Sequence, residues 1–348
     1  MRVKRSMMKL SEVISGVPCV VHGDVDVRVR GIAYDSRNVK EGFMFIAMPG
    51  EHVDGKVFVS KAIEAGASVV VADTIIAVPA GIVLVVACDV RSCLANMAAN
   101  YYNHPDKKML MVGVTGTNGK TTITYLVESI FRAAKLSTGV VGTVNYRYSG
   151  LEFASTNTTP QSAELYRILH EMVRTKQAAA VMEVSSHALV LNRVEGIEFD
   201  IAIFTNLTRD HLDYHVDMEK YFDAKRLLFA GLGHDSQKGF SKNAVVNVDD
   251  EWGRRFRNSF HPRRCGDVML SYRPEYVEDY GQGRGISYGS LYNYDAGVPL
   301  CLYGPRFRSG LFESPVEAVD VAPTLARACG VPLPSSSTGR VLAEALAE

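Results

Sequence analysis

The sequence has no surplus of charge of either sign and no apolar run long enough to cross a membrane. Lysine and arginine together number 38, as do aspartate and glutamate, so the formal net charge at pH 7 is +0. No basic surface for nucleic acid or an anionic membrane is therefore expected. A membrane-spanning helix needs about 18 or more consecutive apolar residues, so membrane insertion is not expected. Glu12 interrupts the apolar stretch behind the basic N-terminus, which argues against a signal peptide.

The six cysteines form no C-x-x-C pair, and some lie in apolar stretches such as Val86-Ala87-Cys88. Zinc and thiol-redox motifs need closely spaced cysteines, so we expect reduced, buried cysteines in a cytoplasmic protein. At 348 residues, a prior of about 150 residues per domain predicts two or three domains. We also expect a monomer.

Residues 109–122, MLMVGVTGTNGKTT, carry the strongest functional signal. The apolar start predicts a buried parallel strand, and an apolar helical pattern opens after Thr122. A strand, a glycine loop and a helix start together form a site where backbone N–H groups cradle phosphates. The strict pattern G-x-x-x-x-G-K-[ST] has its first glycine where Val114 stands here. A helix start with an exposed lysine is the alternative interpretation.

In this loop Lys120 would neutralise phosphate charge, and the Thr121 hydroxyl would hold Mg²⁺. The predicted ATP-binding residues of the loop are Gly116, Thr117, Asn118, Gly119, Lys120, Thr121 and Thr122.

From residue 109 to about 256, strand and helix patterns alternate, which favours a parallel sheet covered by helices. Ligands of such sheets bind outside the carboxyl ends of the strands. Glu183 ends an apolar strand predicted over 178–184, where a carboxylate for Mg²⁺ or for positioning water is expected. After a third strand at 201–204, the loop 205–213 is rich in histidine and carboxylate, which indicates metal or phosphate chemistry. His187, which follows the strand over 178–184, is a weaker candidate, because histidines after a strand often only make structural hydrogen bonds.

The form T-G-T-N-G-K-T-T resembles the Mur ligases, ATP-dependent amide-bond synthetases of peptidoglycan assembly. Asp35-Ser36-Arg37, then F-x-A-x-x-G at 45–50 and D-G at 54–55, resemble the N-terminal domain of the MurE-type branch, the UDP-N-acetylmuramoyl-tripeptide synthetases. That domain holds the UDP end of the substrate. By themselves these short polar segments are better explained as turns.

The resemblance implies a substrate site spread over several segments. Ser36 matches the uridine contact, and His52 falls in a further contact segment. The N-T-T-P stretch at 157–160, which otherwise reads as a helix cap, would bind the muramoyl dipeptide, and Arg193 would meet a substrate carboxylate. Leu191 replaces a usual glutamine, so one polar contact is missing. The implied substrate-binding residues are Ser36, His52, Asn157, Thr158, Thr159, Ser185 and Arg193.

The resemblance also implies two Mg²⁺ ions. His211 matches the ligand of the second ion. Lys225, in Y-F-x-A-K, would carry a carbamate made with CO₂, because a plain ammonium repels a metal; a solvated lysine on an amphipathic helix is the alternative. Asn247, in N-x-D-D, resembles the adenine and ribose contact. The implied catalytic residues are Lys120, Glu183, His211 and Lys225; the metal ligands are Thr121, Glu183, His211 and Lys225.

The resemblance implies that ATP and Mg²⁺ activate UDP-MurNAc-L-Ala-D-Glu as an acyl phosphate, which the amine of a diamino acid then attacks. The family's D-N-P-R motif, which belongs to its amino-acid-binding domain, is not found. Impaired ligation with surviving ATP and precursor binding is therefore expected. The alternatives are a protein that binds both without turnover, a folylpolyglutamate synthetase, and a phosphatase.

The patterns predict an α/β protein in three parts. Residues 1–105 form a small UDP-substrate-binding α/β domain, with strands over 27–32, 44–47, 68–71 and 81–87 and one helix over 57–65; residues 106–256 form the central ATP-binding domain. No lysine occurs after Lys242, and residues 257–348 resemble an incomplete C-terminal end of the alkaline-phosphatase superfamily. Tyr288 stands where that superfamily has a metal-binding histidine, so phosphatase activity is not expected.

Overall fold

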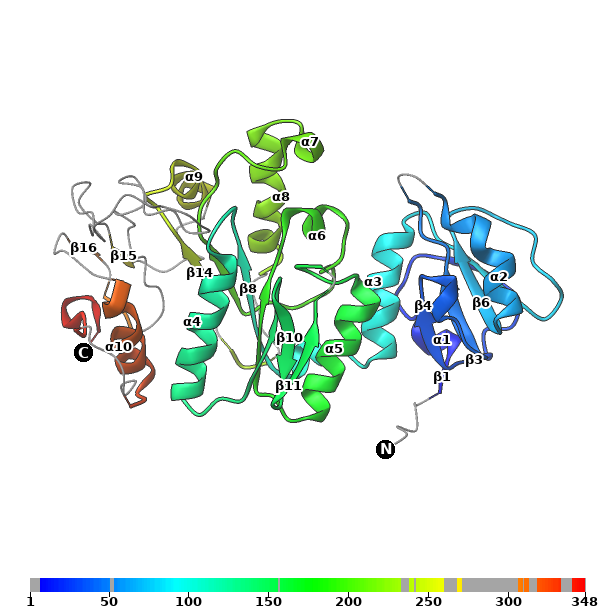
Figure 1. The fold of residues 1–348 in the computed structure, drawn as a ribbon, viewed down its shortest axis with the longest axis horizontal. Coiled ribbons are helices and arrows are strands. Elements are labelled where there is room, and N and C mark those ends of the chain that lie inside the picture. Colours follow the sequence, from blue (N-terminus) through cyan, green and yellow to red (C-terminus); the bar gives the residue numbers. More distant parts are fainter. Residues whose placement is uncertain are drawn as a thin grey trace. The chain divides into compact units, whose positions relative to one another are not determined.

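The computed structural model describes residues 7–50, 53–155, 157–232, 238–240, 242–259, 268–270, 306–308, 310–312, 318–332 and 340–347. Contacts divide the chain into two units, whose elements are labelled in Figure 1. Unit 1 comprises Met1–Pro105, Pro160–Glu171 and Val190–Ile197; unit 2 comprises Asp106–Thr159, Met172–Leu189 and Glu198–Glu348. Within the described ranges, no helix combines the length and apolarity that crossing a membrane requires.

Unit 1 is built on a five-stranded sheet with the strand order β2-β7-β6-β5-β4. Strands β4 to β7 are parallel, β2 is antiparallel to β7, and β1 pairs separately with β3. The strands are β1 (Met8–Lys9), β2 (Val20–His22), β3 (Arg28–Val29), β4 (Gly31–Ala33), β5 (Phe43–Ile46), β6 (Ala67–Ala72) and β7 (Val83–Val86). The helices are α1 (Leu10–Val13), η1 (Ser36–Asn38), η2 (Gly55–Phe58), α2 (Val59–Glu64) and α3 (Val90–Tyr101).

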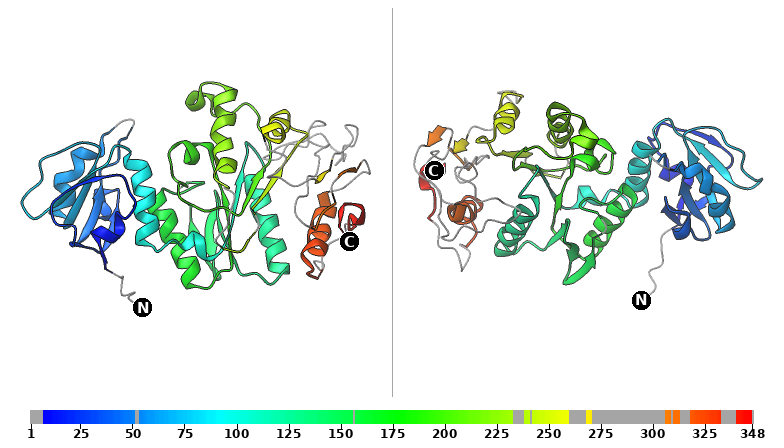
Figure 2. Two further views of the ribbon diagram at one scale, coloured as in Figure 1. Left: turned by 180° about the vertical axis from the view of Figure 1, so that it is seen from behind. Right: turned by 45° about the horizontal axis from the view of Figure 1, so that its top comes forward.

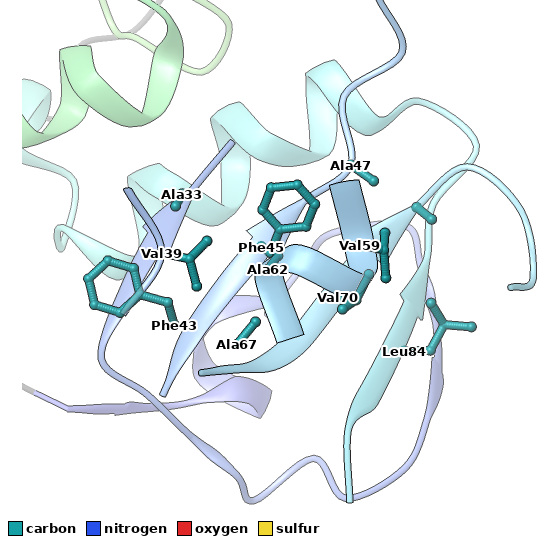
Figure 3. Packing of buried hydrophobic residues seen from close by; sticks show 11 residues of the cluster. Ala33, Val39, Phe43, Phe45, Ala47, Val59, Ala62, Ala67, Val70 and Leu84 are labelled. Atoms are coloured by element: carbon teal, nitrogen blue, oxygen red, sulfur yellow. The ribbon is translucent and has the colours of Figure 1, made fainter. Parts of the chain in front are cut away.

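The core of unit 1 lies between this sheet and α2. Phe45 of β5 and Val70 of β6 are buried in one cluster with Ala62 of α2 and Leu84 of β7 (Figure 3). All four residues of β5 are buried, as expected for a strand in the interior of a parallel sheet. The strands predicted over 44–47, 68–71 and 81–87 are confirmed, with shifts of up to two residues at their ends. The single strand predicted over 27–32 is wrong, because this stretch forms β3 and β4 in two different sheets.

The prediction of a single helix in this part of the chain is wrong, because α1 and α3 are present as well. Helix α3 starts at a clear cap: Asp89 Oδ1 accepts hydrogen bonds from the N–H groups of Arg91 and Ser92, each at 3.0 Å. Eight of its 12 residues are buried, so apolar positions lie around most of the helix. Such a helix lacks the one-sided pattern that sequence reading depends on.

Unit 2 contains a seven-stranded sheet with the order β11-β10-β9-β12-β8-β13-β14. Five neighbouring strands of this sheet are parallel: β9, β12, β8, β13 and β14. The β10–β11 hairpin extends the edge at β9 in antiparallel pairing. The strands are β8 (Leu110–Thr115), β9 (Thr138–Val141), β10 (Asn145–Tyr148), β11 (Leu151–Ala154), β12 (Ala179–Glu183), β13 (Ile201–Phe204) and β14 (Asn243–Val246). The helices that belong wholly or mainly to unit 2 are η3 (Pro105–Lys108), α4 (Lys120–Ala133), α6 (Ser186–Val190), α7 (Leu212–His215), α8 (Met218–Ala230) and α9 (Glu251–Ser259). Helix α5 (Ser162–Arg174) belongs to unit 1 as far as Glu171.

Strand β8 is covered on both faces, since successive residues of a strand point to opposite sides. Val112 faces α4 and belongs to a buried cluster that includes Ile123. Gly113 faces the other side, where a Cβ would lie 2.9 Å from Phe199 and 3.0 Å from Leu228 of α8. The glycine therefore lets α8 pack closely on the sheet, beside which both helices are seen in Figures 1 and 2.

Several further elements follow α9. Strand β15 (Val268–Leu270) pairs in parallel with β16 (Gly310–Phe312), and α10 (Ala318–Cys329) and η4 (Ala343–Ala345) follow. Helix α10 is tied to the next segment because Leu342 N donates to Thr324 Oγ1 at 2.9 Å and Arg340 N donates to Asp320 Oδ1 at 2.7 Å. The domain boundary at 256/257 stays a prediction, and Tyr288 lies outside the described residues.

A buried ion cluster ties together the amino ends of β8, β13 and β14. Asp200 is 0% exposed and accepts a hydrogen bond from Met111 N at 2.8 Å. Its two carboxylate oxygens also meet the ammonium groups of Lys238 at 2.9 Å and Lys242 at 3.1 Å. Glu198 shares Lys242 at 3.0 Å. Asp200 thus pairs with two buried cations, one of which it shares with Glu198.

Asp200→Asn should destabilise the protein, because it removes the anion that two buried ammonium groups share. Breaking a buried ion pair costs about 3–5 kcal/mol, so we expect the free energy of unfolding to fall by about 3 kcal/mol in urea denaturation. Asp223→Asn is the matched control, since Asp223 pairs with Arg226 at the surface. Exposed pairs contribute little, so its midpoint should not move. Equal midpoints for the two variants would contradict this account of Asp200.

Candidate active site

The phosphate loop, residues 116–119, joins β8 to α4. Gly116 has φ 143° and Gly119 has φ 80°, both in the region that favours glycine. A Cβ on Gly116 would lie 1.9 Å from Thr205 Oγ1, so any side chain there would displace the loop after β13. The phosphate loop can therefore lie this close to the loop after β13 only with glycine at position 116. The first glycine of the strict motif, in contrast, is replaced by Val114.

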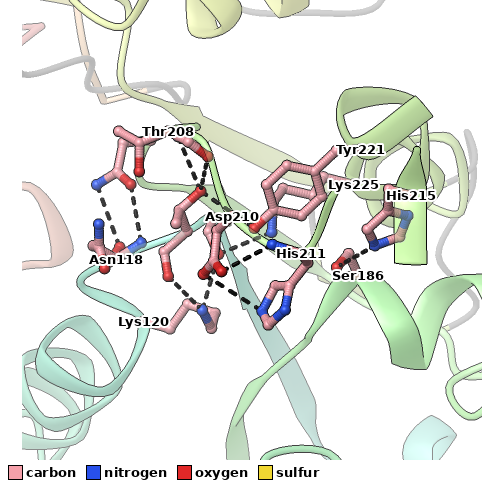
Figure 4. Close-up of polar contacts among 12 residues, drawn as sticks. Asn118, Lys120, Ser186, Thr208, Asp210, His211, His215, Tyr221 and Lys225 are labelled. Atoms are coloured by element: carbon pink, nitrogen blue, oxygen red, sulfur yellow. Dashed lines mark hydrogen bonds and ion pairs between the residues drawn. The ribbon is translucent and has the colours of Figure 1, made fainter. Parts of the chain in front are cut away.

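Hydrogen bonds hold the phosphate loop against the loop that follows β13. Thr117 N donates to Asn206 O at 2.8 Å, and Asn118 N donates to Asn206 Oδ1 at 3.0 Å. Thr205 Oγ1 donates in turn to Asn118 O at 2.6 Å. Figure 4 shows Asn118 at this junction. Contacts with the loop after β13 thus hold the phosphate loop in its conformation.

Two lysines meet on one backbone carbonyl of this loop. Lys120 Nζ donates to Gly116 O at 2.9 Å and to Thr117 O at 2.8 Å. Lys225 Nζ, from α8, donates to the same Gly116 O at 2.9 Å and lies 4.4 Å from the ring centroid of Tyr221. Lys225 is 1% exposed. Sequence reading alone left open a solvated surface position for Lys225, and the structure excludes it.

Burial and mutual repulsion make the lysines of this site unusual. Burial lowers the pKa of Lys225 well below its ordinary value, the nearby Lys120 lowers it further, and Asp210 opposes the change. Burial likewise lowers the pKa of Lys120, opposed by Glu183 and Asp210. The two lysines therefore lie close together in a buried place, and an anion bound here would favour their charged forms in addition to the nearby carboxylates.

Glu183, at the end of β12, is 1% exposed and held by three donors. The Thr121 hydroxyl donates to its Oε1 at 2.9 Å, as does Thr143 N at 2.9 Å, and the Thr143 hydroxyl meets its Oε2 at 3.1 Å. A Cβ on Gly142 would lie 2.4 Å from Oε1. The turn after β9 therefore fits around the carboxylate and fixes its orientation.

These groups fit one Mg²⁺ ion. The described residues contain no group of three or more histidine, cysteine or acidic side chains placed to hold a metal. Mg²⁺ prefers oxygen ligands and is commonly bound by one or two carboxylates together with phosphate oxygens. Glu183 and the Thr121 hydroxyl, in direct contact with each other, supply such oxygens beside the phosphate loop.

Three histidines gather next to this site. The ring of His187 lies 4.9 Å from that of His211 and 5.4 Å from that of His215, centroid to centroid. His211 Nε2 is 3.5 Å from Asp210 Oδ2, and His215 Nε2 is 2.9 Å from Ser186 Oγ (Figure 4). Burial first, then the neighbouring positive groups, lower the pKa of His215 to about 4. His215 is thus a neutral ring that joins α7 to the start of α6.

The loop 157–159 contacts the end of β12. The Thr159 hydroxyl donates to Glu183 O at 2.9 Å and accepts from Ser185 N at 3.1 Å. Thr158 Oγ1 lies 3.0 Å from Thr143 Oγ1. Four of the predicted substrate-binding residues therefore lie in or beside this one junction: Asn157, Thr158, Thr159 and Ser185.

The remaining predicted substrate residues are not part of unit 2. Ser36 is the first residue of η1 and is 8% exposed. The preceding residue, Asp35, caps this helix, because its Oδ1 accepts a hydrogen bond from Arg37 N at 2.9 Å. Arg193 belongs to unit 1 as well. His52 lies outside the described residues. The substrate contacts of these three side chains stay predictions.

Asn247 follows β14 and uses both ends of its amide within the protein. Its Nδ2 donates to Thr205 O at 2.7 Å, and its Oδ1 accepts from Asp249 N at 3.0 Å. Asn247 thus links the end of β14 to the loop after β13, which also holds the phosphate loop. Its role toward adenine stays a prediction.

Sequence patterns do not single out three residues of this site: Thr143, Asp210 and Tyr221. Asp210 lies in the loop 205–213, whose density of histidine and carboxylate is a usable signal. Tyr221 opens the Y-F-x-A-K stretch and covers Lys225. Thr143 carries no charge and belongs to no motif, so only the folded chain reveals its contact with Glu183.

Family models match both parts of the chain that the sequence analysis assigned to Mur ligases. The model described as Mur ligase middle domain matches residues 114–288, and the one described as Mur ligase family, catalytic domain, matches residues 28–102. The first extends beyond residue 257, and neither model supports the expected resemblance of residues 257–348 to the alkaline-phosphatase superfamily.

Individual proteins similar to this chain are also Mur ligases. A Solibacter usitatus protein named UDP-N-acetylmuramoyl-L-alanyl-D-glutamate–2,6-diaminopimelate ligase is 42% identical over 253 residues, 72% of this chain and 50% of that protein. A protein of the same name from Lactiplantibacillus plantarum is 45% identical over 262 residues, 74% of this chain and 53% of its own. A solved structure of a ligase of that name has a TM-score of 0.60 at 28% identity, covering 73% of this chain and 50% of that one. The chain spans about half the length of the curated relatives it matches, and it belongs to the Mur ligase family.

Proposed function

We propose that this protein serves an ATP-dependent amide ligation of peptidoglycan precursor synthesis, in which 2,6-diaminopimelate is joined to UDP-MurNAc-L-Ala-D-Glu. The observation that carries the proposal is the grouping of Lys120, Glu183 and Lys225 around the phosphate loop at the carboxyl end of one parallel sheet. The names of the relatives, which are diaminopimelate ligases, supply the amine.

The proposed reaction overcomes the poor electrophilicity of a carboxylate. An oxygen of the D-Glu side-chain carboxylate attacks the γ-phosphorus of ATP, the bond to the bridging oxygen breaks, and ADP leaves. The amine nitrogen then attacks the acyl carbon, inorganic phosphate leaves, and the nitrogen loses a proton. Lys120 and the N–H groups at the start of α4 stabilise the charge that spreads over the phosphoryl oxygens.

Thr121 and Glu183 would hold Mg²⁺ in this proposal, and the ion would supply positive charge next to the β- and γ-phosphates. The three donors around Glu183 keep its carboxylate oriented toward the loop. The fixed hydroxyl and carboxylate thus provide a preorganised site, which costs little reorganisation during phosphoryl transfer.

Lys225 fits a carbamate that would serve a second Mg²⁺ with His211. Its lowered pKa favours the free amine, which is the form that adds to CO₂. The addition of the neutral amine forms a C–N bond and releases one proton, and because the ammonium has already lost a proton to become that amine, the lysine changes overall from a cation to an anion with the release of two protons. That exchange would remove the repulsion between Lys225 and Lys120. The carbamate and the roles of both residues are part of the proposal.

The proposed ligation predicts that ADP appears only with the correct substrates. We expect ADP release from ATP and Mg²⁺ when UDP-MurNAc-L-Ala-D-Glu and diaminopimelate are both present, measured with a coupled ADP assay. Lys120→Ala should lower the rate by about 100-fold, as expected for the loss of one stabilising donor. Binding of ATP and precursor without ADP in any mixture would show a binding protein without turnover.

Lys225→Arg should abolish the effect of CO₂, because a guanidinium stays charged and cannot form a carbamate. For the unmodified chain we expect the rate of ADP release to rise with added bicarbonate. The stimulation should fade as the pH drops through the lowered pKa of Lys225, since protonation removes the free amine. Lys220→Arg, an exposed lysine on the same helix, is the control and should keep the bicarbonate response. Full activity of Lys225→Arg would rule out the carbamate.

A further inference from the structure

Thr115 carries a buried hydroxyl that has no hydrogen-bond partner among the residues that the structure describes. It is the last residue of β8, directly before the phosphate loop, and it is 0% exposed. Its backbone carbonyl accepts a hydrogen bond from Thr205 N at 3.0 Å, so strand pairing continues up to this residue. A buried hydroxyl without a partner costs free energy, and such a group in a folded protein indicates an acceptor that joins later.

The Thr115 side chain lies on the face of β8 that α8 covers. Successive side chains of a strand point to opposite faces, so Thr115 shares a face with Gly113, where a Cβ would lie 3.0 Å from Leu228 of α8. Lys225, about one helical turn before Leu228, donates to Gly116 O at 2.9 Å. Thr115 therefore lies between the two places at which α8 contacts this part of the chain.

The ammonium group of Lys225 is incompletely satisfied in the same place. It is 1% exposed, and in the described part of the chain its one hydrogen bond goes to Gly116 O. It forms no ion pair with a described carboxylate, and its other near neighbour is the ring of Tyr221, 4.4 Å away. A lysine ammonium has three hydrogens to donate, so this arrangement leaves hydrogens of Lys225 unused.

A carbamate on Lys225 changes what this place requires. Its nitrogen keeps one hydrogen, which is enough for the contact with Gly116 O, and its two oxygens accept hydrogen bonds. The Tyr221 hydroxyl is already 3.2 Å from Thr117 Oγ1. The Thr115 hydroxyl, in contrast, is a donor on this face of β8 whose hydrogen is unused.

We propose that Thr115 is a positioning residue, whose hydroxyl donates a hydrogen bond to one oxygen of a carbamate on Lys225; this inference rests on the proposed function. The free amine of Lys225 adds to the carbon of CO₂, a C–N bond forms and a proton leaves to solvent. The buried hydroxyl then gains an anionic acceptor, and hydrogen bonds to charged groups are the stronger kind. One carbamate oxygen is thereby fixed, and the other stays available as a ligand.

The test measures the carbamate itself, by carbon NMR of the protein in buffer with isotope-labelled bicarbonate and without nucleotide. We expect a carbamate signal that Lys225→Arg lacks. In Thr115→Val the bicarbonate concentration that gives half occupancy should rise about tenfold, because a hydrogen bond to a charged acceptor is lost. Thr115→Ser keeps the hydroxyl and should restore the original value. Thr115→Ala serves as a second variant if valine disturbs folding.

Thermal unfolding without bicarbonate separates this role from a structural one. Thr115→Val removes a hydroxyl that has no partner, so its unfolding midpoint should equal or exceed that of the unmodified chain. Thr124→Val is the matched control, because Thr124 is 1% exposed and its hydroxyl donates to Thr121 O at 2.7 Å. This variant should keep the carbamate signal and its dependence on bicarbonate.

Unchanged half occupancy in Thr115→Val and Thr115→Ala would overturn the inference about Thr115. A midpoint lowered by Thr115→Val without bicarbonate would overturn it as well, because the hydroxyl would then have a partner in the unmodified chain. Absence of a Lys225-dependent signal from the unmodified chain would instead overturn the carbamate in the proposed function.

Discussion

The carbonyl oxygen of Gly116 accepts hydrogen bonds from two lysine ammonium groups, and the chemistry proposed for unit 2 depends on this arrangement. Like charges repel strongly where water is excluded, and burial already disfavours both cations. Glu183 and Asp210 offset part of the repulsion. The folded chain therefore holds two closely placed lysines whose repulsion a polyphosphate, or an anionic modification of Lys225, would relieve.

The parallel sheet that creates this site could be predicted because its strands are short, continuous apolar runs. Strands β8 and β12 are buried on both faces, β13 is buried on one face and partly buried on the other, and all three lead into polar motifs at their carboxyl ends. These motifs contain Lys120, Glu183 and His211. The β10–β11 hairpin escaped prediction: all four residues of β11 are exposed and include alternating apolar side chains without a buried face. Helix α3 was not predicted for the opposite reason: it is buried on most sides, so its sequence has no polar face to mark a helix.

Candidate site residues could be chosen from the sequence where a residue has a charge or a motif, and not where its contacts come from distant segments. Lys225 belongs to a motif, yet its burial against Gly116, 109 positions earlier in the chain, is visible only in the fold. Thr143 meets Glu183 across 40 positions, and nothing in a Gly-Thr pair indicates that contact. Ser36 and Arg193 illustrate a further limit, because they belong to unit 1 and their substrate contacts stay predictions.

The interlock between the phosphate loop and the loop after β13 has a consequence for engineering. Backbone and side-chain atoms of Thr117, Asn118, Thr205 and Asn206 specify one another's positions, and Gly116 leaves no room for a methyl group. Grafting the 116–119 segment alone from another nucleotide-binding protein would leave its new backbone without matching partners. Altered base or phosphate selectivity in this scaffold would therefore require transplanting both loops as a single cassette.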